Sequence, residues 1–112
     1  MKLSDVITNV DAIRPGNAYS NDMKTGWINS LEGRVQTDIF LLGAGEVMSY
    51  DYTTDAQKRL LIEPPHDDVY GIWLQAMIDF SQGEYSAYQN TMAMFNSMWA
   101  NYAAWFFNTY DP

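Results

Sequence analysis

Hydrophobic residues recur at intervals of three and four in four stretches of the chain, and this spacing predicts four α-helices. The first helix has Ser4 as its expected N-cap, because serine is favoured at that position. Its apolar face consists of Val6, Ile7, Val10 and Ile13. It ends at Arg14-Pro15-Gly16, because a proline pushes the residue before it out of helical conformation.

The second predicted helix begins at Ser20 or Asn21 and has the clearest amphipathic pattern in the chain. Its apolar positions are Met23, Trp27, Ile28, Leu31, Val35, Ile39 and Leu42. Gly43-Ala44-Gly45 follows and is expected to end the helix.

The stretch 46–62 is the least helical part of the sequence. Tyr50 and Tyr52, followed by two threonines, favour extended structure. A small hairpin that pairs 47–52 with 60–62 is one interpretation, and an irregular loop lying on the helices is the alternative.

The third predicted helix starts after Pro64-Pro65, where His66-Asp67-Asp68 places acidic groups at the favourable end of the helix dipole. Gly83 fits a left-handed C-terminal cap. The fourth helix spans about 84–108 and at 1.5 Å per residue is about 37 Å long. Its apolar stripe is Tyr85, Tyr88, Met92, Phe95, Trp99, Tyr102 and Phe106. The fold class predicted is therefore all-α: a single helical domain over 1–112, with about four helices and a small extended or hairpin segment at 46–62.

Composition limits the function classes. The chain has 112 residues, no cysteine, and 14 acidic against 6 basic side chains, which gives a net charge of −8. The absence of cysteine excludes disulfides and thiol catalysis. The acidic balance disfavours binding to nucleic-acid phosphates, and no sequence-specific nucleic-acid binding is expected.

No targeting or membrane segment is expected. Met1-Lys2-Leu3 leads directly into Ser4-Asp5, with no apolar signal-peptide region after it. The stretch 85–110 carries no charge but is interrupted by amides and hydroxyls, which are costly at membrane depth. The sequence therefore predicts a protein that is neither exported by a signal peptide nor embedded in a membrane.

Catalytic and cofactor signals are nearly absent. His66 is the single histidine, and His66, Asp67 and Asp68 are adjacent residues that point in different directions on a helical turn, whereas metal ligands must converge. Gly43-Ala44-Gly45 follows a helix and lacks the lysine of a phosphate loop. We expect no enzymatic activity, no metal and no cofactor.

The last predicted helix carries the most informative pattern. Nine of the seventeen aromatic residues lie between Tyr85 and Tyr110. Met94, Met98, Trp105 and Phe107 lie off the core stripe, so the C-terminal half is apolar nearly all round. A helix of this kind is buried on all sides, which so small a domain cannot easily do alone. We expect an oligomer interface formed by Met94, Met98, Trp105 and Phe107 together with Tyr50 and Tyr52 of the 46–62 segment.

Several segments together resemble short proteins of the virion-assembly modules of tailed phages and prophages, in particular the head–tail connector or adaptor proteins. In the first half they are Leu3-Ser4-Asp5-Val6-Ile7, Lys24, Trp27-Ile28-Asn29 and Leu31-Glu32-Gly33-Arg34-Val35. In the second half they are Pro64-Pro65-His66-Asp67, Tyr70, Ala76-Met77-Ile78-Asp79-Phe80, Gly83-Glu84-Tyr85, Tyr88, Asn90-Thr91 and Phe95-Asn96.

The resemblance implies a mostly helical structural subunit that forms a homo-oligomer, in the simplest case a ring at the portal. Its partners are then itself and the portal and tail proteins. Its location is the host cytoplasm during assembly and later the head–tail junction. The 46–62 segment is long for a link between packed helices and departs from this picture.

Three alternatives remain open at this point. A tail-completion protein of the same phage module differs only in its neighbour. An acidic regulatory protein that mimics DNA would need its carboxylates on one face. A small hydrolase or metal-dependent enzyme would have to be built around His66, Asp67 and Asp68.

Overall fold

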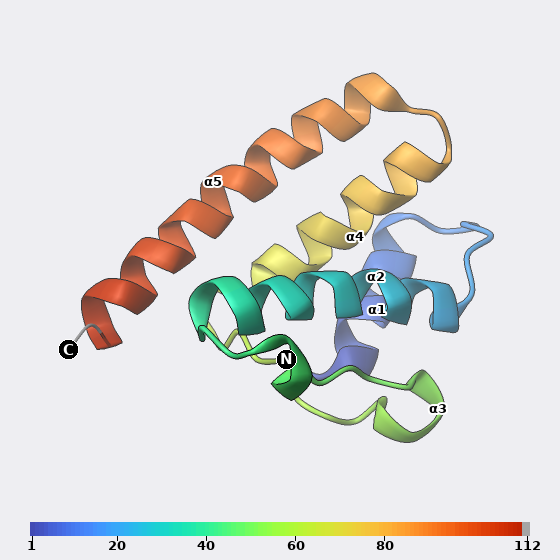
Figure 1. Cartoon of the computed structure of the whole chain (residues 1–112). Helices are drawn as coiled ribbons and strands as arrows, with labels where there is room; N and C mark the ends of the chain where they lie inside the picture. Colours follow the sequence, from blue (N-terminus) through green and yellow to red (C-terminus); the bar gives the residue numbers. More distant parts are fainter. Residues whose placement is uncertain (111–112) are drawn as a thin grey trace.

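The computed structural model describes residues 1–110 and shows an all-α fold (Figure 1). Its helices are α1 (Leu3–Ile13), α2 (Asn21–Arg34), α3 (Tyr52–Asp55), α4 (Asp68–Ser81) and α5 (Tyr85–Tyr110). A π-helical turn η1 (Val35–Ile39) continues α2, and a short 3-10 turn η2 (Ala44–Glu46) follows it. The prediction of an all-helical fold is confirmed.

The first turn of α1 obtains its hydrogen bonds from a distant part of the chain. The Leu3 and Ser4 amides donate to the carbonyls of Lys58 and Ala56, at 3.0 and 2.9 Å. These carbonyls bind two of the free amides at the start of the helix, so α1 begins at Leu3 with Lys2 as its N-cap, and the expectation of Ser4 as the N-cap is wrong by two residues. The stretch before α4 is thereby tied to the start of the chain.

The second helix is shorter than its apolar pattern predicts. Helical structure ends at Ile39, and Leu41 adopts a left-handed backbone with φ of 60°. The Leu42 amide donates back to the Gln36 carbonyl at 2.9 Å, which closes the helix end. The expected continuation to Leu42, with Gly43-Ala44-Gly45 as the stop, is therefore wrong by about one turn.

The hairpin interpretation of 46–62 is also wrong. Within the described residues the only bridge of β type is an isolated one between Lys2 and Arg59. The backbone near Met48 and Tyr50 is extended but bonds to side chains of the α2–η1 helix, and α3 follows it. The alternative of a loop lying on the helices is the observed arrangement.

α4 and α5 form an antiparallel hairpin around Gly83, whose φ of 76° is the left-handed cap that the sequence predicts. α5 packs mainly on α4, with a smaller contact to η1, and α1 and α2 also pack on α4. The core lies among these helices and includes Leu3, Val10, Ile28, Leu31, Val35, Tyr70, Leu74, Ile78 and Phe95. In Figure 1, α5 runs along one side of the molecule and reaches past the start of α4.

α5 leaves most of its surface uncovered. Of its 26 residues, the fully buried ones are Phe95 and Tyr102. At 1.5 Å per residue the helix is about 39 Å long, against 46 Å for the longest extent of the molecule. α5 is therefore an edge helix with one buried flank, and it determines where an interaction surface can lie.

Candidate interaction surface

The predicted interface residues of α5 divide between two sides of the helix. Met94, Met98 and Trp105 follow at intervals of four and seven residues, so they share one side. Phe107 lies nine residues after Met98, two and a half turns further, and faces the opposite side. Met94, Trp105 and Phe107 are 53%, 42% and 40% exposed.

The side with Met94 and Met98 forms one wall of an apolar groove of about 410 Å³. α4 supplies the floor with Gly71 and Ile72, and α1 supplies the opposite wall. The α1 wall consists of Val6, Val10 and Ile13. Ile13 is 58% exposed although it lies on the apolar stripe of α1. Asp67 and Asp68 flank the groove at the start of α4.

Sequence reasoning found the α5 wall of this groove but missed the α1 wall. The sequence places Val6, Val10 and Ile13 on one apolar face of the first helix but does not indicate that this face borders a groove; Val6 and Val10 are also buried in the core. The available signal was Ile13, an apolar residue at the last position of a helix directly before Arg14-Pro15. No pattern within one helix shows that a second helix leaves a gap beside it.

The C-terminal part of α5 carries a run of stacked rings. Trp105 lies against His66 with ring centroids 4.8 Å apart, and Tyr102 lies 5.5 Å from the same imidazole. Phe106 packs on Phe40 at 5.3 Å. Burial raises the pKa of the Tyr102 hydroxyl to about 12. These contacts fix the rings of one side of the helix and leave Phe107 pointing outward.

Tyr50 and Tyr52 lie apart from the α5 surface. They line a polar hollow together with residues of α2, including Asp22 and Asn29. The hydroxyl of Tyr50 donates to Glu32 Oε2 at 2.7 Å. The structure therefore brings Met94, Met98 and Trp105 to one side of α5 and places both tyrosines on another part of the molecule.

Glu32 is the centre of a buried hydrogen-bond network that sequence reasoning did not find. One carboxylate oxygen accepts from Tyr70, and the other accepts from Tyr50 and from the Leu61 amide at 3.0 Å. The Tyr70 hydroxyl in turn accepts from the Ile62 amide at 2.8 Å. Burial raises the pKa of Glu32, and it raises the pKa values of both tyrosines too. The network ties the 46–62 segment to α2 and α4.

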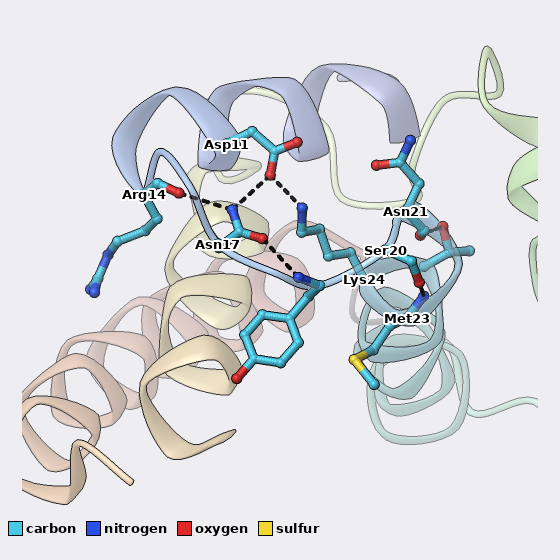
Figure 2. Close-up of polar contacts among 9 residues, drawn as sticks. Asp11, Arg14, Asn17, Ser20, Asn21, Met23 and Lys24 are labelled. Atoms are coloured by element: carbon cyan, nitrogen blue, oxygen red, sulfur yellow. Dashed lines mark hydrogen bonds and ion pairs between the residues drawn. The ribbon is translucent and has the colours of Figure 1, made fainter. Parts of the chain in front are cut away.

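Two further polar clusters join the helices. Asp79 is fully buried, and its carboxylate accepts hydrogen bonds from both terminal nitrogens of Arg14, at 2.7 and 3.2 Å. In the second cluster, shown in Figure 2, Asp11 accepts from Asn17 and from the buried Lys24. Burial alone would raise the pKa of Asp11, but these hydrogen bonds outweigh it and lower the pKa. The first cluster joins the end of α1 to α4, and the second joins α1 to α2, so both have a structural role.

His66, Asp67 and Asp68 do not converge on a common point. The His66 ring contacts the rings of Tyr102 and Trp105, Asp67 is buried, and Asp68 is exposed in the first turn of α4. Among residues 1–110 no group of three or more histidine, aspartate or glutamate side chains is arranged to hold a metal ion.

No protein-family profile, curated protein or solved structure matches the sequence or the fold at a significant level. In the part of the chain that the structure describes, no helix combines the length and apolar character needed to cross a membrane.

Proposed function

We propose that this protein is a structural virion-assembly subunit of a phage or prophage, a head–tail connector-like adaptor that associates with itself and acts at the portal. The observation that carries the proposal is α5. None of its 26 residues has a charged side chain, yet the helix packs against the rest of the subunit along only one flank. The sequence resemblance described above supplies the phage setting.

The exposed apolar residues of α5 favour association. Burying a large apolar side chain contributes roughly 1.5–3 kcal/mol, so Met94, Trp105 and Phe107, each about half exposed, retain an appreciable part of that free energy for a partner. Charged residues are also depleted at the centres of protein interfaces. An uncharged helix on the edge of an acidic protein has both properties.

The charge of the protein agrees with a place beside a DNA channel. Four of the six basic side chains form ion pairs with acidic residues of the same chain, which leaves a surface dominated by carboxylates. A basic lining would hold DNA phosphates, whereas an acidic one lets them pass. On this proposal the subunit is made in the host cytoplasm and ends at the head–tail junction.

Light scattering of the purified protein over a range of concentrations tests self-association. We expect a species of sharp mass that contains several 12.8 kDa subunits. Co-expression with the portal protein of the same gene module tests the location, and we expect the two to purify together. A protein that stays monomeric alone and does not bind the portal would contradict the proposal.

Co-expression with the tail proteins of that module separates an adaptor from a tail-completion protein, since the latter binds the tail and not the portal.

The DNA-mimic alternative has less support. Asp22, Glu46 and Glu84 are exposed at the start of α2, in η2 and in the α4–α5 turn, so these carboxylates come from separate parts of the fold. Titration with a basic DNA-binding protein tests that alternative.

A further inference from the structure

The groove and the outer side of α5 are two surfaces that one molecule cannot bring together. Met98 lies in the groove wall, and Phe107, two and a half turns further along the same helix, faces the opposite side. Both sides expose apolar atoms. A contact that uses one side of α5 in one copy therefore leaves its other side free.

Gly71 lines the groove without contributing a side chain to it. It lies in the floor of the groove, in the interior of α4, where glycine weakens a helix relative to alanine. A Cβ at this position would meet no atom within 4 Å, so nothing inside the subunit requires a glycine there. The missing side chain deepens the groove at the level of Ile72.

Charge selects the segment that can enter. Asp67 pairs with the N-terminal ammonium of Met1 at 3.7 Å, and both line the groove, so Asp68 is the carboxylate there without an ion pair to that ammonium. Asp68 and the net charge of −8 disfavour an acidic segment. α1, α2, α3 and α4 each contain at least one carboxylate, whereas α5 contains none. α5 is thus the helix of this chain that can approach the groove without like-charge repulsion.

The outer side of α5 also has a suitable shape. Ala100 and Ala104 are exposed there, and such small residues let another helix approach closely. Phe107 follows them as a single large apolar side chain, 40% exposed. A smooth helical surface with one aromatic anchor matches a groove that has helices for its floor and walls.

We propose that the outer side of α5, around Ala100, Ala104 and Phe107, binds in the α1–α4–α5 groove of a second copy of the chain. This inference rests on the proposed self-association and specifies its geometry. Because the two surfaces differ, the contact is head-to-tail. Each bound copy still offers one groove and one outer side, so the contact repeats and closes into a ring when the rotation permits.

Complementation between two variants tests the head-to-tail contact. Met94→Asp places a charge in the groove, and Phe107→Asp places one on the outer side. Each variant alone is expected to give the 12.8 kDa monomer by light scattering. An equimolar mixture is expected to give twice that mass and no more, because one intact groove and one intact outer side remain. Met23→Asp, which adds the same charge to an exposed position of α2, should assemble as the unmodified chain does.

Gly71→Leu provides a second groove variant that fills the floor without adding a charge. It should keep the helical circular dichroism spectrum, weaken assembly at least tenfold, and form a dimer with Phe107→Asp. For the outer side, Ala100→Glu serves in the same way.

Three results would separate the possible failures. If the unmodified chain is monomeric at every concentration and does not bind the portal, the proposed function fails and this inference fails with it. If the unmodified chain assembles but the mixture of variants stays monomeric, the head-to-tail contact is wrong. If Met94→Asp blocks assembly while Phe107→Asp does not, a symmetric contact between grooves replaces the one proposed.

Discussion

Glu32 shows how a single side chain can organise a segment that lacks regular structure. Its two oxygens accept from two tyrosine hydroxyls and one backbone amide, which come from 50, 61 and 70. A buried carboxylate is costly unless such donors compensate it. These donors lie far from Glu32 in the sequence, so no local pattern around Glu32 indicates the network.

The raised pKa of Glu32 has a consequence for stability. Since the folded state holds the proton more tightly than the unfolded state, the contribution of Glu32 to stability is greatest below its ordinary pKa of 4.5. It is lost as the pH rises through the folded-state pKa. We expect Glu32→Gln to lower the free energy of unfolding more at pH 4 than at pH 8.

Urea denaturation at several pH values measures this difference. Glu46→Gln, at an exposed glutamate in η2, is the matched control and should show no such trend. A stability difference between Glu32→Gln and the unmodified chain that stays constant with pH would contradict the assignment of the raised pKa to Glu32.

At the level of elements, side chains of the α2–η1 helix supply the hydrogen bonds that a neighbouring strand would otherwise give to the extended segment near Tyr50. Asn29 and Gln36 lie seven residues apart, so they share one side of this helix. The Asn29 amide donates to and accepts from the backbone of Tyr50, at 2.9 and 2.8 Å. Gln36 does the same for Met48, also at 2.9 and 2.8 Å. The extended segment therefore satisfies its backbone through side-chain amides.

The use of side-chain amides in place of a partner strand explains which elements could be predicted from the sequence. The α4–α5 hairpin follows from its apolar period and from Gly83, because each signal is local. The tyrosine- and threonine-rich stretch correctly indicates extended backbone near Tyr50, but the partner of that backbone is a pair of amides and not a strand. Likewise, the end of the second helix is set by the left-handed Leu41, a residue type that gives no signal for this conformation.

Gln36→Leu tests the role of the amides. The change leaves the amide and carbonyl of Met48 without partners, and an unsatisfied backbone group costs about 1–3 kcal/mol. We expect hydrogen exchange at the Met48 amide to accelerate at least tenfold and urea stability to fall. Thr37→Ala, at the exposed neighbouring position, should change neither. Unaltered exchange at Met48 in Gln36→Leu would show that other contacts hold the segment.

For the whole molecule, the edge position of α5 is the decisive feature. The sequence predicts a helix whose C-terminal half is apolar nearly all round, and the structure shows the helix covered along one flank. The α5 residues predicted to form an interface divide between two sides of the helix: three share a side, while Phe107 faces the other way. Sequence spacing gives these directions, but which side α4 covers depends on packing between helices.

Trp105→Asp tests whether the exposed aromatic residues serve assembly or the core. Trp105 is 42% exposed and rests on His66 and Tyr102. We expect the variant to retain its helical spectrum and cooperative unfolding but to remain monomeric in light scattering. Trp105→Phe keeps an aromatic ring and should still assemble. Loss of the folded state in Trp105→Asp would instead assign Trp105 to the core.

The amide contacts of Asn29 and Gln36 also bear on how this chain can vary in evolution. Gln36 binds backbone atoms of Met48 and Asn29 binds those of Tyr50, so neither amide places a demand on the side chains of Met48 and Ser49, which are exposed. Substitutions at these two positions therefore leave the anchorage intact, whereas substitutions at Asn29 or Gln36 do not. We expect related chains to diverge freely at 48 and 49, so that this segment can acquire new specificity on an unchanged scaffold.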